Sequence, residues 1–212
     1  PTQAPWVVHV RSGPARGLLL SPVAHPELRF SYRTRDVPGA SHPTLAAALA
    51  RVAGAREDDV VWDPFAGSGV ELIERALLGP YRELHGSDLE SRALSAAREN
   101  FRSAKVAGVQ LAQADARSHK VAGLSLVLSN PPMGRRVLRA SGLSGLLCQV
   151  VRNVAGQLVP GGRMVWLSPF AEATARAAAD AGLSVERLGS LDLGGFSAEL
   201  QRYFRPLGGS WT

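Results

Sequence analysis

The chain has 212 residues, of which 45% are hydrophobic and 20% charged, a balance typical of a globular protein that buries a substantial core. Its single cysteine excludes an internal disulfide, no apolar stretch is long enough to cross a membrane, and the first residues lack the layout of a signal peptide, so we expect a cytoplasmic protein. The formal net charge of +6 favours a polyanionic partner, although arginine-rich compositions also arise in high-GC genomes without a functional cause.

The first forty residues differ from the rest of the chain. Three short apolar segments, 6–10, 18–20 and 28–32, are separated by glycine or proline and are predicted to be short strands. We therefore expect residues 1–40 to form a β-rich segment or linker, and residues 41–212 to form a single larger domain.

A strand, a glycine turn and a helix follow one another at the start of this domain. The apolar run Val60–Trp62 leads into the turn Asp63–Gly69, and the apolar spacing of residues 70–78 predicts a helix. Glycines in such a turn let the backbone pass close to a ligand at the helix start. The spacing is not that of the dinucleotide fingerprint, and Asp63 would repel a pyrophosphate but suits an ammonium group. A zwitterionic amino-acid cofactor fits better, and a tight turn that merely needs glycine is the alternative.

Two further predicted strands end near a carboxylate. The segment 84–88 ends in Asp88, where an acidic side chain can accept hydrogen bonds from vicinal ribose hydroxyls. The segment 109–113 is followed by Asp115, which supplies another carboxylate on the same edge. Taken singly, Asp88 is also explained as a helix cap, and Asp115 as a loop cap.

The apolar segment 124–128 is followed by Asn130-Pro131-Pro132, the most informative motif of the chain. Proline cannot continue a sheet ladder, so a strand that stops in two prolines leaves carbonyl oxygens free for a ligand. An asparagine carboxamide oxygen beside a free backbone carbonyl can accept both hydrogens of a planar NH2 group. On its own, the motif is explained equally well by a strand that ends in a proline loop.

The rest of the chain continues the alternation of strands and helices. Residues 143–158 and 171–181 are predicted to be helices, 163–168 a strand, and 183–188 and 199–204 a closing antiparallel hairpin. Such alternation implies an α/β fold with a mostly parallel sheet and ligands at the carboxyl ends of its strands.

The three strand ends and Asn-Pro-Pro, in this order, resemble the S-adenosylmethionine-dependent methyltransferases of the Rossmann-like class I, in the branch that methylates amino groups. The resemblance runs from about Pro43 to Arg205 and is closest to the tRNA guanine-N2 methyltransferases that pair this domain with an RNA-binding THUMP domain. Residues 38–49 and 133–136 look like signatures of that group. The resemblance implies a seven-stranded sheet with helices on both faces, and methylation of the 2-amino group of guanosine in RNA, with tRNA the first candidate. It also implies that the sequence is a fragment of a protein whose missing part selects the RNA.

The resemblance assigns roles to residues along one edge of the sheet. It implies S-adenosylmethionine as the cofactor and no metal ion. Asp88 would bind the ribose hydroxyls, Leu89 would pack on the adenine ring, and Asp115 with the Ala116 amide would read the adenine edge. The other cofactor-binding residues implied, at and around the methionine end, are Pro43, Thr44, Asp63, Pro64, Phe65, Ala66, Gly67, Ser68, Gly69 and Asn130.

The same resemblance implies that Asn130 and the Pro131 carbonyl hold the substrate amine, with Pro132 and Met133 completing the catalytic motif. An aromatic residue is commoner where Met133 stands, but a thioether can also cover a purine face. This difference argues against adenine methylation of DNA and against protein glutamine methylation. Two arginines follow that would contact substrate phosphates, or else form a solvated basic loop: Arg135 and Arg136.

Two alternative functions stay open at this point. One is adenine-N6 methylation of DNA or rRNA, which uses the same kind of amine-binding motif. The other is an RNA-binding module that retains the cofactor pocket without turnover. Methyl transfer to oligonucleotides that contain only one kind of amino-bearing base would distinguish adenine methylation from guanine methylation. Cofactor binding without methyl transfer to any RNA would indicate the binding module.

Overall fold

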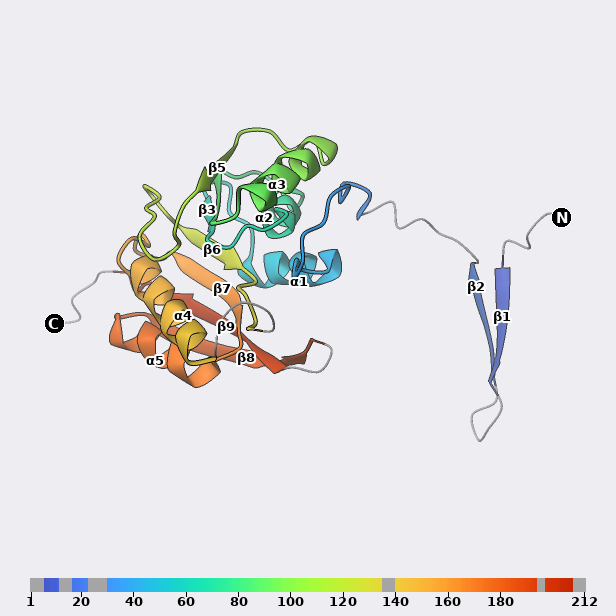
Figure 1. Ribbon diagram of the computed structural model, residues 1–212. Helices are drawn as coiled ribbons and strands as arrows, with labels where there is room; N and C mark the ends of the chain where they lie inside the picture. Colours follow the sequence, from blue (N-terminus) through green and yellow to red (C-terminus); the bar gives the residue numbers. More distant parts are fainter. Residues whose placement is uncertain (1–5, 12–16, 23–29, 135–139, 194–196, 208–212) are drawn as a thin grey trace.

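The computed structural model describes residues 6–11, 17–22, 30–134, 140–193 and 197–207. The larger domain contains α1 (Pro43–Ala53), β3 (Val60–Asp63), α2 (Val70–Ala76), β4 (Glu83–Asp88), α3 (Ser91–Ser103), β5 (Val109–Gln113), β6 (Leu126–Ser129), α4 (Ala140–Ala155), β7 (Arg163–Ser168), α5 (Ala171–Asp180), β8 (Ser184–Asp192) and β9 (Ser197–Phe204). The strands form one sheet in the order β5-β4-β3-β6-β7-β9-β8 (Figure 1). Strands β3 to β7 are parallel, whereas β9 runs antiparallel between β7 and β8. The predicted class I fold is confirmed.

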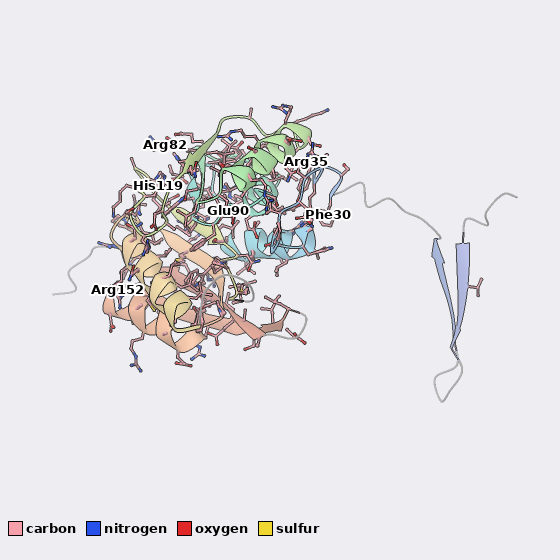
Figure 2. All side chains as sticks on the ribbon, viewed as in Figure 1. Phe30, Arg35, Arg82, Glu90, His119 and Arg152 are labelled. Carbon is pink, nitrogen blue, oxygen red and sulfur yellow. The ribbon has the colours of Figure 1, made fainter. Side chains whose placement is uncertain are left out.

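Alternate residues of the central strands face opposite helical layers, as a strand requires. Val61 and Leu128 are fully buried on the face covered by α1, α2 and α3. Trp62, Val127 and Trp166 are fully buried on the face covered by α4 and α5. Side chains fill the space between the sheet and both layers (Figure 2). Within the described residues, no helix is both long and apolar enough to cross a membrane.

The segment before this domain contains two of the three strands predicted there. β1 (Trp6–Arg11) and β2 (Gly17–Pro22) pair antiparallel in a two-stranded sheet of their own. The third predicted strand, 28–32, is wrong in its described part. Residues 30–32 form a turn instead, because the Arg33 amide donates to the Phe30 carbonyl at 3.0 Å.

Residues 30–40 pack on the larger domain through polar and aromatic contacts. The Tyr32 side chain is buried, and its hydroxyl donates to Glu74 of α2 at 2.7 Å. The Arg35 amide donates to Asn100 of α3 at 2.9 Å, and its side chain lies beside that helix (Figure 2). The boundary expected at residue 40 stays a prediction.

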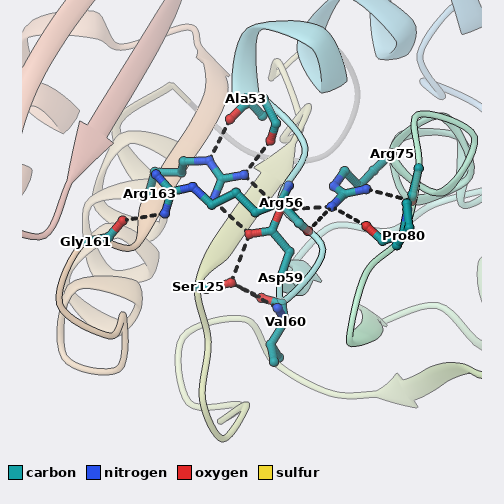
Figure 3. Close-up of polar contacts among 11 residues, drawn as sticks. Ala53, Arg56, Asp59, Val60, Arg75, Pro80, Ser125, Gly161 and Arg163 are labelled. Atoms are coloured by element: carbon teal, nitrogen blue, oxygen red, sulfur yellow. Dashed lines mark hydrogen bonds and ion pairs between the residues drawn. The ribbon is translucent and has the colours of Figure 1, made fainter.

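A buried ion cluster joins elements at the amino-terminal edge of the sheet (Figure 3). Asp59, just before β3, accepts hydrogen bonds from Arg163 of β7 at 2.8 and 2.9 Å and from Arg75 of α2 at 2.9 Å. Ser125 and the Arg56 amide donate to the same carboxylate at 3.1 and 3.0 Å. Burial alone would raise the pKa of Asp59, but the hydrogen bonds and charges of the two arginines outweigh it and lower the pKa to about 2. The carboxylate therefore stays ionised and links three segments.

Candidate active site

The sheet order brings the four polar motifs predicted from the sequence to one edge. Strands β5, β4, β3 and β6 are parallel neighbours, so their carboxyl ends lie side by side. Asp115, Asp88, Asp63 and Asn130 lie at or just after these ends in that spatial order. The site is therefore a row of four acceptor side chains along one rim.

Asp63 is fully buried at the end of β3. One carboxylate oxygen, Oδ1, accepts from the Phe65 amide at 3.0 Å and from the Ser129 hydroxyl at 2.6 Å. The other, Oδ2, is buried and has no hydrogen-bond partner among the described residues. Burial, and then the nearby charge of Glu71, raise the pKa of Asp63 well above its ordinary value. A buried oxygen without a partner is costly unless a proton or a cationic ligand supplies one.

The glycine turn after Asp63 connects β3 to α2 and contacts the next strand. Gly69 has φ 82°, and a Cβ there would lie 2.8 Å from the Phe101 ring, so glycine is required for both backbone and packing reasons. The Gly67 amide donates to Asp88 Oδ2 at 2.9 Å. Phe65 and Gly67 are half-buried, and the rest of the turn is buried: Pro64, Ala66, Ser68 and Gly69.

The predicted ribose and adenine residues follow β4 and β5. Asp88 is half-buried and Leu89 is 63% exposed, unusually open for a large apolar side chain. The Asp115 carboxylate is paired with Arg117 at 2.5 Å, and this hydrogen bonding lowers the pKa of Asp115. Ala116 is buried. An adenine amine would therefore share Asp115 with a guanidinium group.

Asn130 lies just after β6, half-buried. Its Nδ2 donates to the Ser41 hydroxyl at 2.8 Å, and Ser41 in turn donates to the carboxylate of Glu71. Asn130 Oδ1 is buried and has no partner among the described residues. The Asn-Pro-Pro turn is thus connected to α2, the helix that the glycine turn opens.

Sequence reasoning did not identify Ser41, Glu71 or Ser129 as parts of this site. Ser41 lies in the stretch 38–49, which contributed to the family resemblance. Its distance in sequence from Glu71 and Asn130 gave no indication that it contacts them. Glu71 sits in the first turn of α2 and is only 5% exposed, and its pKa is raised by that burial. The one feature of the sequence that could have identified Glu71 is that it is an acidic residue on the apolar face of a short helix.

The remaining predicted residues are placed as follows. Pro131 is buried, Pro132 is exposed, and Met133 packs partly buried against the core cluster that includes α1. Pro43 is the buried first residue of α1, and Thr44 beside it is exposed. Two predicted substrate-binding residues lie outside the described part of the chain: Arg135 and Arg136. In that described part, no three His, Cys, Asp or Glu side chains are grouped so that they could hold a metal ion.

Comparison with known proteins identifies similar sequences and structures. The chain is 37% identical over 133 residues to a tRNA (guanine(6)-N2)-methyltransferase of Thermus thermophilus, covering 61% of this chain and 40% of that protein. It is 33% identical over 133 residues to a ribosomal protein L11 methyltransferase of Pseudomonas putida, covering 62% of this chain and 41% of that protein. The crystal structure of TrmN from Thermus thermophilus superposes with a TM-score of 0.72 at 29% identity, covering 84% of this chain and 52% of that one.

The chain thus spans about 40% of the length of these curated relatives. A family model described as "RMKL-like, methyltransferase domain" matches residues 31–195, well over half of the chain. This match contains α1 and all four strand-end motifs of the site. The chain belongs to the RMKL-like methyltransferase domain family.

Proposed function

We propose that this domain transfers a methyl group from S-adenosylmethionine to the 2-amino group of guanosine in tRNA. The observation that carries the proposal is a pair of buried oxygens, Asp63 Oδ2 and Asn130 Oδ1, at the ends of adjacent strands, neither of which has a hydrogen-bond partner among the described residues. One suits the ammonium group of an amino-acid cofactor, and the other suits an uncharged amine. The choice of guanosine in tRNA rests on the similarity to the Thermus guanine-N2 methyltransferase.

The residues present fit S-adenosylmethionine, which supplies an electrophilic methyl group on sulfonium. In this proposal Asp63 Oδ2 accepts a hydrogen bond from the ammonium group, because it is buried and ionisable and no side chain or amide in the described part of the chain bonds to it. Asp88 keeps acceptor capacity for ribose hydroxyls, since a carboxylate offers about four lone-pair sites and the Gly67 and Glu90 amides take two. Leu89 offers the exposed apolar surface on which an adenine ring packs.

The chain's contribution to methyl transfer is to hold the amine. The lone pair of a guanine 2-amino group is delocalised into the ring, so the group is a poor nucleophile. Two fixed acceptors, Asn130 Oδ1 and the Pro131 carbonyl, would favour a pyramidal nitrogen and stabilise the positive charge that develops on it. The methylated nitrogen is strongly acidic and loses its proton after transfer. We therefore assign no general base.

Cofactor affinity is expected to fall as the pH is lowered through the raised pKa of Asp63. Only the ionised carboxylate attracts an ammonium group, and protonating it removes up to about tenfold in affinity per pH unit. Calorimetry with S-adenosylmethionine between pH 4 and pH 8 measures this dependence. Asp63→Asn should bind weakly with a flatter pH profile, whereas Asp88→Asn should retain the slope. An affinity that is constant over this range in the wild type would contradict the role of Asp63.

Replacing Asp88 with alanine is expected to weaken cofactor binding by about 1 to 3 kcal/mol, the usual cost of leaving buried partners unpaired. The variant loses the ribose acceptors and also releases the Gly67 and Glu90 amides. Titration calorimetry gives the change in affinity. The matched control is Asp58→Ala, which removes an exposed aspartate near the opposite edge of the sheet. Equal cofactor affinities in the Asp88→Ala and Asp58→Ala variants would show that Asp88 does not bind the cofactor.

The reaction itself is tested by transfer of radiolabelled methyl groups to unmodified tRNA, followed by mass spectrometry of the nucleosides. We expect N2-methylguanosine. N6-methyladenosine or a labelled ribosomal protein would replace the proposal with a different amine substrate. Cofactor binding without transfer to any acceptor would indicate a binding module. Loss of N2-methylguanosine from the tRNA of a deletion strain is the corresponding test in cells.

A further inference from the structure

The hydrogen bonds around Ser41 set the orientation of the Asn130 carboxamide. A hydroxyl group has one proton to donate and two lone pairs that accept. The Ser41 proton is donated to a carboxylate oxygen of Glu71, which is the acceptor in this hydrogen bond. Ser41 therefore meets Asn130 as an acceptor, and the group it faces must be the Nδ2 amide, at 2.8 Å.

These two hydrogen bonds, from Asn130 to Ser41 and from Ser41 to Glu71, leave only one stable orientation for the Asn130 carboxamide. If the carboxamide were rotated by half a turn, Oδ1 would face the lone pairs of Ser41, and two acceptors would be in contact without a proton between them. In the observed orientation Oδ1 is buried and without a partner among the described residues, as a substrate acceptor must be. Ser41 is 7% and Glu71 is 5% exposed, so water competes little for these bonds.

We propose that Ser41 and Glu71 are positioning residues of the methyl-transfer site, and that they hold the Asn130 carbonyl oxygen toward the substrate amine. The inference rests on the proposed function, because it concerns the acceptor used in that reaction. Neither residue contacts the amine. Their effect on kcat passes through Asn130, whereas the charge of Glu71 also raises the pKa of Asp63 and so bears on cofactor affinity.

A double-mutant cycle separates positioning from general stabilisation. In the 212-residue chain, Ser41→Ala should lower kcat by roughly tenfold to a hundredfold, the effect of a misaligned group, with cofactor affinity within about twofold of the wild type. In an Asn130→Ala background the same substitution should cause no further loss. A loss of kcat by the same factor in both backgrounds would overturn the proposal.

Glu71→Gln provides a second variant of nearly unchanged shape. A glutamine amide can donate to Ser41, which frees the Ser41 proton, so the Asn130 carboxamide can then rotate by half a turn and its Oδ1 can accept that proton. We expect a smaller loss of kcat than in Ser41→Ala, and again none in the Asn130→Ala background. A Glu71→Gln enzyme with the kcat of the wild type would show that Glu71 does not help to position Asn130.

The matched control is Ser125→Ala. Ser125 also donates to a buried carboxylate, Asp59, but does so at the opposite edge of the sheet. This variant should lose comparable stability while kcat stays unchanged. A fall in kcat as large as that of Ser41→Ala would show that loss of any such bond impairs the enzyme, and would overturn the proposal.

A measurement without substrate keeps this inference separate from the proposed reaction. The side-chain amide signal of Asn130, identified by its absence in Asn130→Ala, should exchange slowly with water in the wild type and in Ser125→Ala, and rapidly in Ser41→Ala. Unchanged exchange in Ser41→Ala would overturn the positioning role. If the wild type methylates no guanosine and the exchange pattern still holds, the proposed reaction fails while the fixed orientation of Asn130 stands.

Discussion

Replacing Asn130 with alanine is expected to lower kcat for methyl transfer by roughly 10² to 10³, the usual effect of removing one preorganised polar group from a developing charge. The side chain supplies the buried oxygen that would accept the substrate amine. Its only described hydrogen-bond partner is Ser41, so the cofactor side of the site should be little changed. Single-turnover transfer to tRNA and calorimetric cofactor affinity, measured on one preparation, test both halves of the expectation.

The matched control for this variant is Gln110→Ala, which removes an exposed carboxamide from β5 and should leave kcat unchanged. A parallel loss of cofactor affinity in Asn130→Ala would assign Asn130 to the cofactor rather than to the amine. A kcat close to that of the wild type would leave the amine-binding role to the backbone alone. Either result would remove the main physical argument for an amino-methylating enzyme.

The strand-end residues could be predicted from the sequence because each follows a short apolar run. The carboxyl ends of parallel strands lie on one edge of the sheet whatever the details of packing. Asp63, Asp88 and Asn130 could therefore be assigned to one site from the sequence alone. The strand predicted over residues 28–32 is wrong in its described part, 30–32, because the pattern of a short segment does not reveal how its side chains pack in the tertiary structure. Its alternation is typical of a strand, but in the structure Tyr32 is used to fill the core beside α2.

The supporting contacts could not be predicted, because they join residues that are distant in sequence. Ser41 is 89 residues from Asn130 and 30 from Glu71, and no local periodicity relates such positions. Asp59 and Arg163 are 104 residues apart. Charged residues such as these are usually placed on the surface by sequence reasoning, and only the tertiary structure reveals that they are buried together.

Removing the Asp59 carboxylate should produce the largest loss of stability of any single substitution considered. In Asp59→Ala two almost fully buried guanidinium groups, those of Arg75 and Arg163, lose their shared anion. Breaking a buried ion pair by deleting one partner costs about 3 to 5 kcal/mol, because the remaining charge is left uncompensated. Denaturant unfolding measures the loss. Asp58→Ala, at the adjacent exposed position, should change the free energy of unfolding by no more than about 0.5 kcal/mol.

The pH dependence of unfolding tests the charge itself. The pKa of Asp59 is lowered from an ordinary value of 3.8 to about 2 in the folded protein. Because the folded state binds this proton less readily than the unfolded state does, the stabilisation is complete above about pH 4 and is lost as the pH falls toward 2. In Asp59→Asn, which keeps the shape but lacks the charge, this component of the acid transition should be absent and the protein less stable at neutral pH. Identical acid profiles for the two proteins would mean that hydrogen bonding rather than charge holds Arg75 and Arg163 in place.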